Sequence, residues 1–281
     1  MLLRSLQTRY IRRMLLPRKS DLIWLLILIF AALTPKALAQ EISLPAKLPG
    51  QKVIVLDPGH GGHDLGAVGP SGLAEKSLTL ALAQEIKDIL SGAYTVYLTR
   101  DGDYWVDIEK RTAIANHLRA DVFVSLHAGG SFHHKAGGMA IYYFCPGTTQ
   151  GLSLQQEENT VGAIDTLRLW DDIQAVHAAK SKLLADIVHR QLLAKLNPMD
   201  RGIHKAPCSV LRGADMPAIL FEIGYVSHPA EEKELRDSSV LAAVAEAVSQ
   251  GIREFFRQQG GCLSARDMIE EDIGTGRGAA W

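Results

Sequence analysis

Two histidines and one glutamate stand at positions from which they can bind a single metal ion. His60 lies in the glycine-rich loop 57–67 after an apolar segment, Glu75 opens an amphipathic segment, and His127 follows a second apolar segment. Two imidazoles and one carboxylate are the ligand set of a catalytic zinc ion, which keeps its fourth position for water. Taken singly, each also has a structural explanation, because an acidic residue favours a helix start and a histidine can be hydrogen-bonded in the core.

A second carboxylate, Glu222, follows the strongly apolar segment 218–221. A carboxylate is costly to bury there without a charged partner, and a nearby zinc ion would supply one. Glu222 can then accept a proton from the water that the metal activates. The structural alternative is a glutamate held in a salt bridge. Phosphate binding by the loop after the first apolar segment is not favoured, because the loop lacks the glycine and lysine spacings of the nucleotide-binding motifs.

The segments that position these residues alternate between apolar and amphipathic. Strands are expected at 52–56, 94–98, 121–126, 138–144 and 218–221, and helices at 78–90, 108–119, 180–196 and 240–256. This alternation predicts one α/β domain around a mostly parallel sheet. Sites in such sheets form beyond the carboxyl ends of the strands, so chemistry is expected in the loops after Leu56, Leu126 and Phe221.

Length and charge exclude some functions. The 281-residue chain has a formal net charge of -1, which argues against a nucleic-acid-binding surface. The length suits one catalytic domain of about 200 residues with a processing segment before it and a short tail after it. We expect a linker at 40–51, the catalytic domain at 52–257 and a disordered tail at 258–281.

Residues 1–39 are predicted to be a secretory signal. Basic residues precede the apolar run 22–33, and Ala37-Leu38-Ala39 offers small residues for cleavage after Ala39. An uncleaved membrane anchor is the alternative, although the run is shorter than the roughly 20 residues that span a bilayer. Either way, the domain is expected outside the cytoplasm, in the periplasm or cell envelope.

Several other residues with reactive or charged side chains are expected to be structural. Arg100 and Arg111 are assigned to ion pairs within the fold, although both could meet carboxylates of a ligand. Cys145, Cys208 and Cys262 have no CxxC spacing, so neither a zinc site nor a nucleophile is expected from them. In an oxidising compartment Cys145 and Cys208 are the more plausible pair, and three unpaired cysteines are an equal alternative.

Four motifs together resemble those of a known family. Segments 56–62, 75–76, 125–128 and 222–227 are similar, in the same order, to motifs of the zinc-dependent N-acetylmuramoyl-L-alanine amidases. The similarity runs from about Lys52 to Phe256 and includes the linking segments 98–100, 111–116 and 210–212. The single motifs are not specific, whereas their combination is.

The resemblance implies a six-stranded sheet flanked by helices, zinc ligands at His60, Glu75 and His127, and a catalytic glutamate at Glu222. It also implies hydrolysis of the amide between N-acetylmuramic acid and the L-alanine that begins the peptide stem of peptidoglycan. A monomer that binds no nucleic acid is expected. Two alternatives stay open: a zinc hydrolase of another amide or peptide bond, and an inactive homologue that binds the cell wall.

Two positions depart from the family pattern. His228 and Gly129 stand where the family commonly has asparagine, and neither change removes a ligand. Some relatives carry an insert whose helix covers the site until a partner removes it. Within residues 147–180, Glu158-Asn159 resembles the start of that region, but the insert is short. Autoinhibition and an activator protein are therefore hypotheses, with an ordinary linking helix the favoured explanation.

Overall fold

The computed structural model of the chain describes residues 50–131, 134–144 and 170–274. The predicted signal, almost all of the predicted linker, Cys145 and most of the insert lie outside the described residues. Within the described part, no helix is both long and apolar enough to cross a bilayer.

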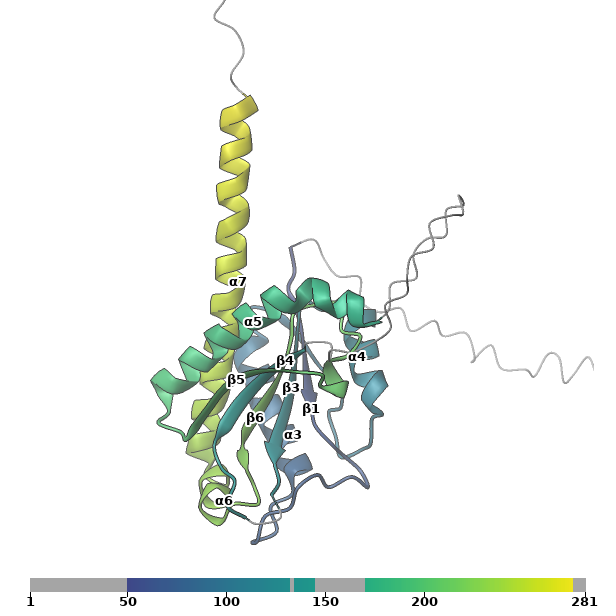
Figure 1. Cartoon of the computed structure of the whole chain (residues 1–281), viewed down its shortest axis with the longest axis vertical. Helices are drawn as coiled ribbons and strands as arrows, with labels where there is room; N and C mark the ends of the chain where they lie inside the picture. Colours follow the sequence, from purple (N-terminus) through teal and green to yellow (C-terminus); the bar gives the residue numbers. More distant parts are fainter. Residues whose placement is uncertain (1–49, 132–133, 145–169, 275–281) are drawn as a thin grey trace, which may run out of the picture. The chain divides into compact units, whose positions relative to one another are not determined.

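The described residues form a six-stranded sheet with helices against it (Figure 1). In chain order the elements are β1 (Val53–Pro58), α3 (Glu75–Leu90), β2 (Thr95–Leu98), α4 (Ile108–His117), β3 (Val122–Gly129), β4 (Met139–Phe144), α5 (Trp170–Lys195), β5 (Asp200–Ala206), the short 3-10 helix η2 (Ser209–Leu211), β6 (Ala218–Tyr225), α6 (Pro229–Leu235) and α7 (Ser238–Gly274). The predicted α/β class with a six-stranded, mostly parallel sheet is confirmed.

The sheet order is β2-β1-β3-β6-β4-β5. Strands β2, β1, β3 and β6 are parallel, whereas β4 pairs antiparallel with β6 and parallel with β5. The carboxyl ends of β1, β3 and β6 therefore share one edge of the sheet with the amino ends of β4 and β5. This edge places the loops after three strands next to the residues that begin two others.

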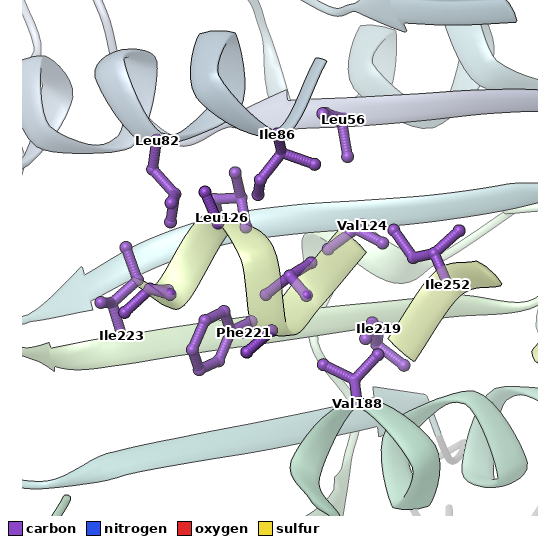
Figure 2. Close-up of a cluster of buried hydrophobic side chains, with 14 of the residues drawn as sticks. Leu56, Leu82, Ile86, Val124, Leu126, Val188, Ile219, Phe221, Ile223 and Ile252 are labelled. Carbon is purple, nitrogen blue, oxygen red and sulfur yellow. The ribbon is translucent and has the colours of Figure 1, made fainter. Parts of the chain in front are cut away.

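Two apolar clusters, one on each face, hold the sheet. The larger joins alternate residues of β1, β3 and β6 to helices α3, α5 and α7. Figure 2 shows Leu82 and Ile86 of α3 beside Leu126 of β3, and Val188 of α5 beside Ile219 of β6. The smaller cluster includes Phe123 and residues around α4 and η2. Because both faces are covered, the central strands are almost continuously apolar, which is the pattern that made them predictable.

Three elements differ from the expectation. Strand β5 was not predicted because its residues are largely polar and partly exposed, as is common at a sheet edge. Helix α6 was also missed because it is short: it begins at Pro229 and has seven residues. Helix α7 continues to Gly274, so the backbone is helical in most of the segment that was expected to be a disordered tail, and no proline interrupts it there.

Candidate metal centre

The loop after β1 presents His60 in an uncommon backbone conformation. Its φ angle is 63°, in the left-handed region that a residue with a Cβ rarely adopts. The preceding residue, Gly59, is required for a different reason: a Cβ there would lie 2.4 Å from the ring of His127. The absence of that atom lets the end of β1 approach the end of β3 closely enough for the two histidines to meet.

Two buried arginines hold the backbone of this loop. Arg111 donates from Nη1 to Asp57 Oδ1 and to the carbonyl of Pro58, both at 2.8 Å, and from Nη2 to the carbonyl of His60 at 3.0 Å. Arg100 donates from Nε to the same Pro58 carbonyl at 2.9 Å. The structural ion pair expected for Arg111 is therefore present, whereas Arg100 binds main-chain carbonyls. Together they stabilise the strained conformation that aims His60.

Replacing Arg111 with methionine should destabilise the protein by about 3–5 kcal/mol, because it leaves the buried charge of Asp57 without the cation that is hydrogen-bonded to it. Asp57 is fully buried and would keep only the hydroxyl hydrogen bonds from Thr99 and Ser125. Urea unfolding of the metal-free protein measures the loss. Lys110→Met, an exposed neighbour on α4, is the matched control. Equal unfolding midpoints for the two variants would show that the Asp57–Arg111 pair is dispensable.

The three candidate ligands converge at the shared edge of the sheet. His60 Nε2 and His127 Nδ1 each lie 3.0 Å from Glu75 Oε1. One ligand atom from each residue can be chosen so that all three lie within 4.8 Å of one another. The two imidazole rings meet edge to face, with centroids 5.1 Å apart. Residues that are far apart in the sequence thus form one compact group of metal-binding atoms.

Glu75 is held as a carboxylate in this group. Its side chain is buried, and its two oxygens accept hydrogen bonds from the backbone N–H groups of Ala128 and Ala67, both at 2.9 Å. Burial alone would raise the pKa of Glu75, but the hydrogen bonds and charges of His127 and His60 outweigh it and lower the pKa to about 2. Glu75 therefore carries its negative charge at neutral pH.

Asp64 orients His60 and was not singled out from the sequence. Its Oδ2 lies 2.7 Å from His60 Nδ1, which leaves Nε2 directed at Glu75. A carboxylate on the outer nitrogen fixes the ring of a metal-binding histidine and its tautomer. Burial lowers the pKa of His60, but Glu75 and Asp64 together outweigh it, so the net pKa is raised. The only local signal was an acidic residue four positions after His60 in the same loop.

Glu222 lies beside the group on β6. It pairs in register with His127 of β3 on one side and with Ala140 of β4 on the other. Its Oε2 is buried and has no hydrogen-bond partner among the described residues. Burial raises the pKa of Glu222 and the charge of Glu75 adds to the rise, while His127, His60 and Arg201 oppose it, leaving the pKa at about 7. An unpartnered buried carboxyl is costly and suggests a missing charged or reacting partner.

The donor set fits zinc. Ligand atoms bound at 2.0–2.1 Å in a tetrahedron lie roughly 3.3 Å apart, which agrees with the close spacing of this group. The ligand atoms are two imidazole nitrogens and one carboxylate oxygen, and within the described part of the chain no fourth protein ligand joins them. A position is thus left for water or substrate, as catalytic rather than structural zinc sites require.

The two departures from the family pattern have structural explanations. At the start of α6, His228 Nδ1 accepts a hydrogen bond from the N–H of Glu231 at 3.4 Å, which is the capping role that asparagine also fills well. At the end of β3, a Cβ on Gly129 would lie 2.7 Å from the ring of Tyr225. Glycine therefore lets Tyr225 lie against the strand end, two residues after His127.

Cys208 carries a free thiol, and burial raises its pKa, with the charge of Glu222 adding to the rise. A raised pKa keeps the thiol protonated and unreactive at neutral pH, which agrees with the expectation that it is not a nucleophile. Its suggested partner, Cys145, lies outside the described residues.

Comparison with known proteins identifies the family. Residues 54–254 match the model of the N-acetylmuramoyl-L-alanine amidase family, and the chain belongs to that family. The amidase AmiC of Neisseria meningitidis is 36% identical over 219 residues, covering 73% of this chain and 52% of the relative. The chain therefore spans about half the length of that relative. The amidase AmiA of Escherichia coli is 30% identical, covering 75% of this chain and 78% of the relative.

Solved structures of amidases have the same fold. The catalytic domain of CwlV from Bacillus (Paenibacillus) polymyxa aligns with a TM-score of 0.60 at 31% identity, covering 74% of this chain and 99% of that domain. AmiC2 of Nostoc punctiforme aligns with a TM-score of 0.60 at 29% identity, covering 74% of this chain and 98% of that structure. The described α/β domain is thus an amidase catalytic fold.

Proposed function

We propose that this protein is a zinc-dependent peptidoglycan hydrolase that cleaves the amide between N-acetylmuramic acid and the L-alanine of the peptide stem. The observation that carries the proposal is a buried carboxyl of raised pKa, Glu222, beside a His–Glu–His group on one edge of the sheet. Family membership supplies the identity of the bond, because the site geometry by itself fits hydrolysis of many amides.

His60, Glu75 and His127 would hold the zinc ion, and Asp64 would keep the ring of His60 in the required orientation. When bound, zinc lowers the pKa of water and polarises a carbonyl group. Glu222 accepts the proton of the attacking water and delivers it to the departing alanine nitrogen. Glu222 is placed for both steps because it pairs in register with His127 and its Oε2 has no hydrogen-bond partner among the described residues.

The proposal places the enzyme in the periplasm or cell envelope, after export by residues 1–39. The apolar run and the small residues before Gln40 support this localisation, and a relative from Staphylococcus epidermidis is named as a probable cell wall amidase. Cleavage of the signal, a monomeric state, regulation by residues 147–180 and an activator protein stay predictions. Of that segment, only the part from Trp170 onwards, at the start of α5, is among the described residues.

One experiment separates the proposal from its alternatives. The mature protein, from Gln40 to Trp281, is incubated with zinc and defined muropeptides, and the products are identified by mass spectrometry. Release of the intact stem with a free L-alanine amine supports the amidase. Products cut within the peptide would favour a different zinc hydrolase, and zinc binding without any product would favour an inactive wall-binding homologue.

A further inference from the structure

Arg201 is an exposed cation at the same sheet edge as the metal-binding group. It is the second residue of β5, and because β5 runs opposite to β6, the start of β5 lies at the carboxyl edge of the parallel strands. Its guanidinium carbon lies 5.4 Å from the centroid of the Tyr225 ring. That geometry is a cation–π contact, which supports the side chain from one face and leaves the hydrogen-bonding edge of the fork open.

Arg201 has no carboxylate partner within ion-pair distance in the part of the chain that the structure describes. Its neighbour Asp200 is engaged elsewhere, because Oδ1 accepts from Gly202 N–H at 2.7 Å and lies 2.8 Å from His189 Nε2. Among the described residues the guanidinium makes one hydrogen bond, a long one of 3.5 Å from Nη1 to the carbonyl of Gly137. Most of the five donors of this arginine are therefore available to a ligand.

Tyr225 links this cation to the reaction centre. Its N–H donates to Glu231 Oε2 at 2.7 Å, and its ring occupies the space over Gly129 that a side chain there would fill. Tyr225 is three residues after Glu222 on β6. The positive charge of Arg201 lowers the pKa of Glu222. The aromatic ring thus holds Arg201 within electrostatic reach of the candidate general base.

We propose that Arg201 recognises a carboxylate of the peptide stem and makes the enzyme prefer stems whose second residue carries a free α-carboxylate over stems in which that group is a carboxamide. The inference rests on the proposed amidase function. The first carboxylate beyond the scissile nitrogen lies about two residues away, or roughly 7 Å along an extended chain. Strand β5 is two strand spacings from Glu222 on β6, roughly 10 Å. The side chain of Arg201 extends towards β6, where it contacts Tyr225, and so covers the difference between these two lengths.

An arginine is suited to this choice. Its planar fork binds a carboxylate through two parallel hydrogen bonds, whereas a carboxamide offers one acceptor and no charge. Hydrogen bonds to charged groups are about twice as strong as neutral ones, which corresponds to a preference of about 10- to 100-fold.

The test compares two muropeptides that differ only in this group, a D-glutamate α-carboxylate or its carboxamide. The ratio of kcat/KM for the two substrates is measured for the wild type, Arg201→Gln and Arg201→Lys. The wild type should prefer the carboxylate about 10- to 100-fold, Arg201→Gln should bring the ratio close to one, and Arg201→Lys should give an intermediate ratio because it keeps the charge and loses the fork.

Lys205→Gln is the matched control. Lys205 is an exposed cation on the same strand, but it pairs with Tyr143 on the face of the sheet opposite to Glu222 and should keep the wild-type ratio. A wild type that cleaves both substrates equally, or an Arg201→Gln variant that keeps the preference or loses both activities in proportion, would overturn the inference while the amidase function stands. A wild type that releases L-alanine amines from neither muropeptide would instead overturn the proposed function.

Discussion

Glu222→Gln should lower kcat by about 100- to 10,000-fold while the zinc content stays at the wild-type level. The carboxamide cannot accept the proton of the attacking water, and positioned proton transfer contributes about that factor. Glu222 is not one of the three candidate ligands, so the metal-binding group is preserved. Stem release from muropeptides, measured together with zinc by elemental analysis on the same sample, checks both halves of the expectation.

Glu234→Gln is a suitable control for this substitution. Glu234 is an exposed carboxylate on α6, and the same change there should leave both activity and zinc content unaffected. If Glu222→Gln retained most of its activity, another group would have to accept the proton, and the role assigned to Glu222 would be wrong.

Glu222→Gln should be more stable than the wild type at alkaline pH when both proteins are metal-free. Glu222 has a folded-state pKa of about 7 against an ordinary value of 4.5, so the folded state holds the proton more tightly than the unfolded state does. Its contribution is thus favourable below pH 4.5 and is lost as the pH rises to 7. The gap in unfolding free energy between Glu222→Gln and wild type should grow by about 3 kcal/mol between pH 4 and pH 8.

Urea unfolding at a series of pH values measures this gap. Because the histidines of the site are common to both proteins, their titration largely cancels in the difference. A gap that does not change with pH would mean that burial of the Glu222 carboxylate does not destabilise the folded protein. A growing gap would identify the carboxyl as one whose position costs stability and is retained for its chemistry.

His127→Ala should remove stoichiometric zinc and reduce stem release to background. Only two of the three candidate ligands then remain, and Glu75 loses the imidazole whose hydrogen bond most strongly lowers its pKa.

Asp64→Asn should have a smaller effect than His127→Ala, about a 10- to 100-fold loss of zinc affinity, because it weakens the orientation of His60 without removing a ligand. Competition with a chromophoric chelator measures the affinities.

His117→Gln provides the control for histidine removal. His117 lies in the last turn of α4 and is not part of the metal-binding group. The His117→Gln variant should bind zinc like the wild type. Chelation of the wild type should abolish activity, and added zinc should restore it. Normal zinc stoichiometry in His127→Ala would contradict the ligand assignment, and an unchanged affinity in Asp64→Asn would contradict the orienting role of Asp64.

Much of the fold could be predicted from local patterns. The apolar run that became β1 and the buried stripe on α3 are visible as periodicity, because a strand covered on both faces must be apolar and a helix on a sheet must bury one side. Strand β5 and helix α6 could not be predicted in this way. Their residues are mostly polar, and each contributes few apolar side chains to the core, so pairing with β4 and capping by His228 help to stabilise them.

For the metal centre, the residue types, their order and their place after apolar segments can be read directly from the chain. That was enough to name His60, Glu75, His127 and Glu222 and to assign them roles, which stay proposals. Their convergence, in contrast, depends on how the strands are ordered in the folded domain. The order β1-β3-β6 brings three strand ends together, and a missing Cβ at Gly59 lets two rings approach.

The tertiary structure also decided which residues support the centre. Asp64 on His60 and Arg201 held by Tyr225 have no distinctive local signal. Arg111 was expected to form an ion pair, but its hydrogen bond to the His60 carbonyl could not be inferred from the sequence. Arg201 comes to this edge because β4 turns antiparallel and carries β5 with it. Alternating strands and helices predicted a mostly parallel sheet, but which strand runs antiparallel depends on pairing between segments far apart in the chain.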